Sequence, residues 1–195
     1  MIETQQIKEL REKTGAGISD IKRVLEQAKG DMARAIELLE RTLGSAAEKK
    51  ASRETRGGVV EAYVHSNSRI GALVEMLCET DFVARNPAFR ELAHGIAMHI
   101  AAMRPLYLSL ETIPKDIWQS EKERFEEEAK ALGKPALVVE QIVDGKLKVY
   151  FGALALLEQP FVKDQDKTVG EVVNEAIGRF GENIKVGRFA RFEIY

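Results

Sequence analysis

Apolar residues recur at helical spacing in three short stretches near the N-terminus. The first stretch, around Ile7 and Leu10, stops at the Thr-Gly-Ala-Gly run 14–17, because glycine tolerates the backbone angles at which a helix turns. The other two have apolar residues three or four positions apart: Ile18, Ile21, Leu25 and Ala28, then Met32, Ala35, Ile36, Leu39 and Leu43. The pattern predicts a three-helix domain at residues 1–43.

Residues 44–57 differ in character from the helices before them. Good helix formers such as alanine, glutamate, lysine and arginine dominate the segment, and no apolar stripe runs through it. Gly44 lies at one end, and Gly57 and Gly58 lie at the other. We therefore predict a solvated helical linker at 44–57, which leaves residues 58–195 as a separate core domain.

The core begins with two apolar runs, 59–65 and 69–77, on either side of the turn-forming residues Ser66, Asn67 and Ser68. So short a connection between two strand-like runs predicts an antiparallel hairpin. The second run is apolar at consecutive positions, which is typical of a strand that is buried on both faces. We therefore expect this run to be the central strand of a sheet.

Helical patterns fill most of the chain after the hairpin. They cover 87–103, 114–132, a stretch after Pro135 that is interrupted at Asp144 and Gly145, and 169–180, where Gly181 ends the helix. A final strand is predicted at 184–194. The predicted fold class is α+β, with an N-terminal three-helix unit, a helical linker, and helices packed on a small antiparallel sheet.

Composition narrows the class of protein. The 195 residues carry a net charge of −2, so no broad basic field favours direct nucleic-acid binding. A single cysteine, Cys78, cannot form an internal disulfide and suits a reducing compartment. The sequence has neither a basic-then-apolar N-terminal segment nor an apolar run of about 20 residues, so we expect a cytoplasmic protein without membrane contact.

The residue patterns of common catalytic and metal sites are missing from the sequence. His94 and His99 stand five positions apart, whereas a helical zinc pair needs a spacing of about four. No phosphate-binding glycine loop occurs, and one cysteine cannot build a multi-thiolate metal site. We expect no metal, no cofactor and no covalent catalysis, and we interpret the histidines and Cys78 as ordinary surface or core residues.

The connection that follows the second strand is the most distinctive segment. It places Thr80, Asp81, Phe82 and Val83 just before the helix at 87. Two interpretations are open from the residues alone. In one, Thr80 or Asp81 caps the turn and Phe82 packs in the core. In the other, Phe82 projects as an anchor for a partner's pocket, and Asp81 projects beside it as a carboxylate able to disturb an octahedral Mg²⁺ site.

Several motifs resemble those of the elongation factor Ts family in its short bacterial form. They occur in the family's order along nearly the whole chain: LREKTGAG at 10–17, CETDFVARN at 78–86, LEQPFVKD at 157–164, GENI at 181–184 and RFARFE at 188–193. Each motif is moderately specific, and together they make a strong resemblance. The long members of the family carry a duplicated core, for which this chain is too short.

The resemblance implies a guanine-nucleotide exchange factor that binds elongation factor Tu in its GDP-bound and nucleotide-free states. The family's exchange element corresponds here to Thr80, Asp81, Phe82 and Val83. In the family the phenylalanine inserts near the partner's Mg²⁺ and phosphate site, the aspartate acts beside it, and GDP leaves. Such a function makes and breaks no covalent bond, which agrees with the missing catalytic patterns.

The resemblance also gives roles to the two ends of the chain. It implies that residues 1–43 form a ubiquitin-associated-like domain. Its residues expected to contact the partner are Gly15, Ala16, Gly17, Ile18 and Ile21. The short form implies a homodimer, for which the strand at 184–194 is a candidate edge. Some short members carry a cysteine where this chain has Ala190, so the dimer is expected to be noncovalent.

Three alternatives remain open. The chain is a protein-binding module without exchange activity, an RNA-binding translation accessory protein, or an enzyme that uses a carboxylate site. The RNA-binding alternative rests on the basic residues Lys49, Lys50, Arg53 and Arg56, among which no aromatic residue is interleaved. The enzyme alternative rests only on the abundance of carboxylates.

Overall fold

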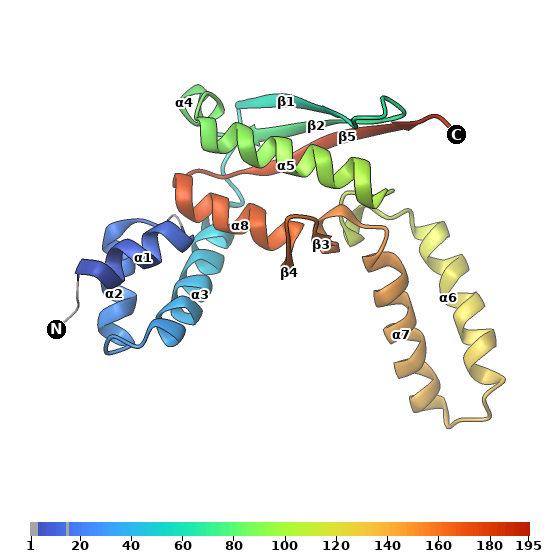
Figure 1. The fold of residues 1–195 in the computed structure, drawn as a ribbon. Helices are drawn as coiled ribbons and strands as arrows, with labels where there is room; N and C mark the ends of the chain where they lie inside the picture. The colour runs from blue at the N-terminus through green and yellow to red at the C-terminus, as the bar shows by residue number, and fades with distance from the viewer. Residues whose placement is uncertain (1–3, 15) are drawn as a thin grey trace. The chain divides into compact units, whose positions relative to one another are not determined.

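The computed structural model describes residues 4–14 and 16–195. Helices and a small antiparallel sheet make up the fold, which confirms the predicted α+β class (Figure 1). Contacts within the chain define two units. One unit runs to Ala62 and also includes Leu73–His94 and Glu171–Phe189. The other combines Tyr63–Ala72, Gly95–Gly170 and Ala190–Tyr195.

Three helices open the described chain: α1 (Thr4–Thr14), α2 (Ile18–Gln27) and α3 (Met32–Lys50) (Figure 1). Their apolar stripes meet in one buried cluster, formed by Leu10, Ala16, Ile21, Val24, Leu25, Ala28, Ala35 and Leu39. Helix α3 continues through Gly44 to Lys50, so the segment predicted as a linker begins inside this helix. A glycine within a helix costs only about 1 kcal/mol relative to alanine, and the helix formers around Gly44 offset that cost.

A three-stranded sheet has the order β1 (Gly57–Val64), β2 (Ile70–Cys78) and β5 (Lys185–Glu193). Strands β1 and β2 form the predicted hairpin, and β2 is the central strand, as expected. The burial expected on both faces of β2 is wrong, because Leu73 is 45% exposed. The buried side chains of β2 alternate along the strand: Ala72, Val74, Met76 and Cys78.

Helices α5 (Pro87–Met103) and α8 (Val169–Phe180) lie where the sequence pattern predicts them. In the first unit, Phe89 of α5 and Phe180 of α8 meet edge to face, with ring centroids 6.0 Å apart. Helix α8 ends at Gly181, as predicted, and the φ of +74° at this residue is a left-handed conformation that glycine adopts without strain. This ending sets the direction of the turn that leads into β5.

The second unit contains an antiparallel pair of helices, α6 (Lys115–Lys130) and α7 (Ala136–Gly152) (Figure 1). Trp118 of α6 stacks on Phe151 of α7 with ring centroids 4.6 Å apart. Phe125, one heptad after Trp118, is buried in the same cluster. The heptad spacing of Trp118 and Phe125 therefore marks the face on which the two helices pack.

The interruption predicted at Asp144 and Gly145 is wrong, because α7 is continuous through both residues. Val143 and Leu147 flank the pair and are buried in the cluster that α7 shares with α6. This packing outweighs the poor intrinsic helix propensity of aspartate and glycine. Periodicity over the whole helix predicts its continuity better than the two local residues do.

The shorter elements of the second unit were not predicted. Strands β3 (Pro160–Phe161) and β4 (Asp164–Thr168) form a two-stranded antiparallel hairpin. Two 3-10 turns lie between longer elements: η1 (Leu110–Thr112) between α5 and α6, and η2 (Leu156–Glu158) between α7 and β3. In the part of the chain that the structure describes, no helix is both long enough and apolar enough to cross a membrane.

A buried histidine joins elements of the second unit. The side chain of His99, on α5, is inaccessible to solvent. Its Nδ1 accepts a hydrogen bond from the backbone N–H of Val162 at 3.1 Å, so the proton lies on Nε2, which donates to Oε1 of Gln159 at 2.9 Å. Burial lowers the pKa of His99, and the hydrogen bond to Gln159 opposes that shift. His99 is therefore a satisfied, neutral core residue, as the sequence suggested.

Candidate functional site

A single helical turn, α4 (Asp81–Ala84), follows directly after the central strand. Thr80 has an extended backbone and caps this turn, since its side-chain oxygen accepts a hydrogen bond from the backbone N–H of Val83 at 3.5 Å. Val83 and Ala84 are buried, whereas the two residues before them face solvent. The turn is thus anchored on one side and free on the other.

Phe82 lies on the free side of this turn, and 83% of its surface is exposed. The interpretation in which Phe82 packs in the core is therefore excluded. Asp81 projects from the same turn with its side chain 80% exposed, and its carboxylate lies 3.9 Å from the guanidinium of Arg85. An exposed ion pair of this length contributes little to stability. The turn therefore exposes an aromatic ring and, at the preceding position in the sequence, a carboxylate.

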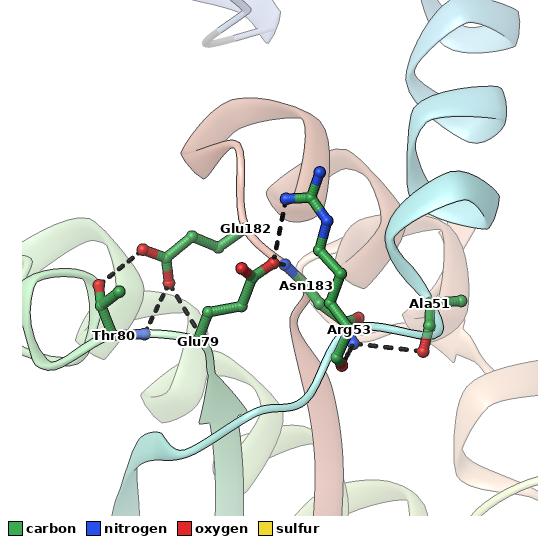
Figure 2. Close-up of polar contacts among 6 residues, drawn as sticks. All are labelled: Ala51, Arg53, Glu79, Thr80, Glu182 and Asn183. Carbon is green, nitrogen blue, oxygen red and sulfur yellow. Dashed lines mark hydrogen bonds and ion pairs between the residues drawn. The ribbon is translucent and has the colours of Figure 1, made fainter.

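The backbone just before this turn is held by the carboxylate of a residue that is far away in the sequence (Figure 2). Oε2 of Glu182 accepts hydrogen bonds from the backbone N–H groups of Glu79 and Thr80, each at 3.0 Å. Oε1 of Glu182 accepts a third hydrogen bond, from the hydroxyl of Thr80 at 2.6 Å. Both carboxylate oxygens of Glu182 are therefore committed to the residues that precede α4.

The reverse contact completes this arrangement. Oε1 of Glu79 accepts a hydrogen bond from the backbone N–H of Asn183 at 2.6 Å and lies 3.5 Å from the guanidinium of Arg53. The buried side chain of Asn183 donates to the carbonyl oxygens of Ala51 at 3.3 Å and Arg53 at 2.6 Å (Figure 2). We refer to Ala51, Arg53, Glu79, Thr80, Glu182 and Asn183 as the anchoring network. It joins three segments of the first unit that are far apart in the sequence.

Close backbone approach adds to the support of the turn. A Cβ atom on Gly57, at the start of β1, would lie 3.0 Å from the carbonyl carbon of Thr80. At Gly58, where φ is +157°, a Cβ atom would collide with the carbonyl oxygen of Met76. Any residue other than glycine at these two positions would push β1 away from the end of β2. In the sequence alone, these glycines mark only the end of the linker.

Cys78 lies at the start of the site but is not suited to nucleophilic chemistry. Its side chain is buried, and its thiol donates to the carbonyl oxygen of Thr80 at 3.2 Å. Burial raises the pKa of the Cys78 thiol, and the negative charge of Glu182 raises it further. The thiol therefore stays protonated, as expected for a small core side chain.

The residues expected to contact a partner from the N-terminal helices differ in their accessibility. Gly17 and Ile18 lie at the surface where α2 begins, and Ile18 is 44% exposed. Ala16 and Ile21 are buried in the cluster of the three helices, so their side chains support that surface from beneath. Gly15 lies outside the described residues.

The anchoring network is the part of the site that sequence reasoning missed. GENI was noted as a motif, but no role was assigned to Glu182 or Asn183. The available signal was a pair of polar residues between Gly181, which ends α8, and β5.

The network also pairs Arg53 with Glu79, while Arg56 pairs with Glu54 at 2.8 Å. Two of the four basic residues behind the RNA-binding alternative thus each lie beside a carboxylate. Among the described residues, no cluster of histidine, cysteine and acidic side chains is arranged to hold a metal.

Comparison with known proteins identifies the class to which this fold and site belong. The family model described as "Elongation factor TS" matches residues 4–194. A relative named elongation factor Ts from Carboxydothermus hydrogenoformans is 50% identical over 100% of this chain and 89% of its own length. Relatives with the same name from Fervidobacterium nodosum (49% identical, covering 99% and 98%) and Thermotoga maritima (50%, covering 96% and 94%) agree. The chain is a translation elongation factor, with a role in protein biosynthesis. It belongs to the elongation factor Ts family.

Proposed function

We propose that this chain is the guanine-nucleotide exchange factor for elongation factor Tu. It binds the GDP complex of that partner, disturbs the Mg²⁺ and phosphate site, and releases GDP. Membership of the elongation factor Ts family supports the choice of partner. The exchange makes and breaks no covalent bond, so the chain needs neither a cofactor nor a metal of its own. We place its action in the cytoplasm, without contact with membrane or nucleic acid.

The observation that carries this proposal is the exposure of Phe82 on an anchored turn. A phenylalanine that is 83% exposed adds little to the hydrophobic stabilisation of this chain, and its burial in a partner's pocket is favourable. Thr80 and Val83 hold the turn on which it lies. Phe82 acts as the wedge, and the carboxylate of Asp81 acts beside it on the metal coordination of the partner.

Exchange follows from thermodynamic linkage between this chain and the nucleotide. A factor that binds nucleotide-free elongation factor Tu more tightly than the GDP complex weakens the binding of GDP by the same ratio. A coupling free energy of about 4 kcal/mol corresponds to roughly a thousandfold loss of GDP affinity. The ring of Phe82 and the carboxylate of Asp81 on α4 have to supply this difference, because interactions that are equal in both states shift no equilibrium.

The N-terminal helices provide a second contact in this proposal. Residues 1–43 act as a ubiquitin-associated-like domain, with residues 44–57 leading into the core at 58–195. Gly17 and Ile18 are the surface residues available for the contact. Ala16 and Ile21 support them from the cluster beneath, and Gly15 is the remaining residue assigned to this contact.

A noncovalent homodimer completes the proposal. Strand β5 is at one edge of the sheet, and an unpaired edge can pair with a second chain. Phe192 on β5 and Ile194 just after it are exposed, so association through this edge would bury apolar surface. Ala190 supplies no thiol for a disulfide. Equilibrium sedimentation at micromolar concentration is expected to give the dimer mass, and a monomer would contradict this part of the proposal.

The exchange activity is tested by the release of a fluorescent GDP analogue from elongation factor Tu, followed by stopped flow. The expected result is a large acceleration when this chain is present in amounts well below those of its partner. A folded chain that binds the partner without accelerating release would leave the protein-binding module as the better description. Turnover of a nucleotide by the isolated chain would instead favour an enzyme.

A further inference from the structure

The turn that carries Phe82 is short and has few hydrogen bonds of its own. Helix α4 has only four residues, and an isolated helical turn is unfavourable because it fixes several backbone angles for a single hydrogen bond. The capping bond from Val83 to Thr80 is long, at 3.5 Å. The orientation of Phe82 therefore depends on the burial of Val83 and Ala84 and on what fixes the backbone of residues 79 and 80.

Glu182 is the side chain that fixes it. Its carboxylate takes three hydrogen bonds from Glu79 and Thr80, two of them from backbone N–H groups. Hydrogen bonds to an ionised acceptor are stronger than neutral ones. Because two of these donors are backbone groups, the contact sets the path of the chain and not merely the rotamer of one side chain.

Glu182 is itself held in place from behind. The preceding residue, Gly181, ends α8 in a left-handed conformation. The following residue, Asn183, donates its backbone N–H to Glu79 and its side-chain amide to the carbonyls of Ala51 and Arg53. Glu182 is thus ordered before any partner arrives, and the entropic cost of ordering it does not reduce the free energy of binding.

We propose that Glu182 is a positioning residue for nucleotide exchange: it holds residues 79 and 80, and through them the turn of Phe82, in the conformation that enters the partner. The inference rests on the proposed exchange function. Glu182 does not touch the nucleotide or the metal in this account. It acts through the turn that carries Phe82 and Asp81, chiefly through Phe82, and this distinguishes it from a residue that merely stabilises the fold.

A double-mutant cycle tests the dependence on Phe82. The variants are Glu182→Ala, Phe82→Ala and the two combined, with Glu127→Ala on the exposed surface of α6 as a control. Glu182→Ala is expected to lower the saturating rate of GDP release by roughly tenfold or more, as the loss of charge-assisted hydrogen bonds predicts. In the Phe82→Ala background the same change is expected to have less than about a twofold effect, because only the smaller contribution of Asp81 remains for Glu182 to position. Equal losses in both backgrounds would overturn the proposal.

The conservative variant Glu182→Gln gives a second discrimination. The amide oxygen of glutamine can accept from the backbone N–H groups of Glu79 and Thr80, and its nitrogen can donate to the Thr80 hydroxyl. This variant keeps the geometry but loses the charge assistance, so it is expected to lose clearly less of the exchange rate than Glu182→Ala. A loss as large as that of Glu182→Ala would mean that the charge, and not the geometry, matters, and would overturn the positioning role.

Hydrogen exchange in the free chain gives a readout that needs no partner. The amides of residues 79–84 are expected to exchange faster in Glu182→Ala than in the unaltered chain or in Glu127→Ala. Unchanged protection of these amides would overturn the proposal even if activity fell. If the unaltered chain did not accelerate GDP release from elongation factor Tu, both the exchange function and the role of Glu182 in it would be contradicted. An active unaltered chain with an equally active Glu182→Ala variant would overturn only the role of Glu182.

Discussion

Glu182 and Thr80 are 102 positions apart in the sequence, yet the carboxylate of Glu182 accepts hydrogen bonds from both the backbone N–H and the hydroxyl of Thr80. This contact lies directly beneath the turn that exposes Phe82 and Asp81. The free surface of the turn is thus separate from the part that holds it. Substitutions at the surface should change activity without changing stability, and substitutions in the anchoring network should change both.

Asp81→Ala is expected to slow GDP release by less than Phe82→Ala does and to leave the free energy of unfolding within about 0.5 kcal/mol of the unaltered value. The side chain is 80% exposed, and its ion pair with Arg85 spans 3.9 Å in solvent. Stopped-flow release and urea denaturation measure the two effects. A loss of exchange equal to that of Phe82→Ala would reverse the ranking of the two residues.

Asn183→Ala is expected to lower the free energy of unfolding by about 1–3 kcal/mol, because it removes two hydrogen bonds from a buried amide. Asn174→Ala, at an exposed position of helix α8, is the matched control and should change stability by less than about 0.5 kcal/mol. Urea titrations of both variants make the comparison. If Asn183→Ala were as stable as the control, the network would not anchor the segment at Ala51 and Arg53.

Ile18→Ala is expected to raise the concentration of factor needed for half-maximal GDP release several-fold while leaving the saturating rate nearly unchanged. Ile18 is 44% exposed at the start of α2, and in the proposed contact it serves association and not the wedge. Ile21→Ala is the contrasting variant: its buried side chain should cost about 2–5 kcal/mol of stability. An Ile18→Ala variant with unaltered affinity would remove this residue from the contact surface.

As the pH falls, the free energy of unfolding should decrease more steeply in the unaltered chain than in a variant that lacks His99. Burial lowers the pKa of His99 in the folded chain below its ordinary value, so the unfolded chain takes up a proton first as the pH falls. The neutral form stabilises the fold above about pH 6.5, and this contribution is lost as the pH drops below that value toward the lower folded pKa. Free energies of unfolding measured between about pH 7.5 and pH 5 should fall less in His99→Gln than in the unaltered chain. Equal slopes would contradict this assignment.

Local patterns predicted the regular elements well and the site only in part. The end of α8 at Gly181 and the hairpin around Ser68 follow from turn chemistry within a few residues. The supposed break at Gly145 was wrong because packing against α6 overrides local propensity. The β3–β4 hairpin escaped notice because β4 is the polar stretch DQDKT, which has no apolar alternation.

The orientation of Phe82 could not be derived from periodicity, because a residue in a connection belongs to no repeating face. Only the resemblance to a family favoured exposure, and the structure then excluded the core interpretation. The role of Glu182 could not be found at all from local patterns, since its partners lie more than a hundred positions away. Contacts of such sequence separation become visible only when the chain is folded.

The most direct test of the account is the rate of GDP release from elongation factor Tu with the Phe82→Ala variant. The variant should remain folded, because the ring is 83% exposed, and it should lose about thirtyfold or more of the acceleration, as is usual when an aromatic anchor is truncated. Tyr195→Ala, which removes an exposed aromatic ring at the C-terminus, should retain the full rate. A folded Phe82→Ala variant that released GDP as fast as the unaltered chain would contradict the wedge and the exchange mechanism built on it.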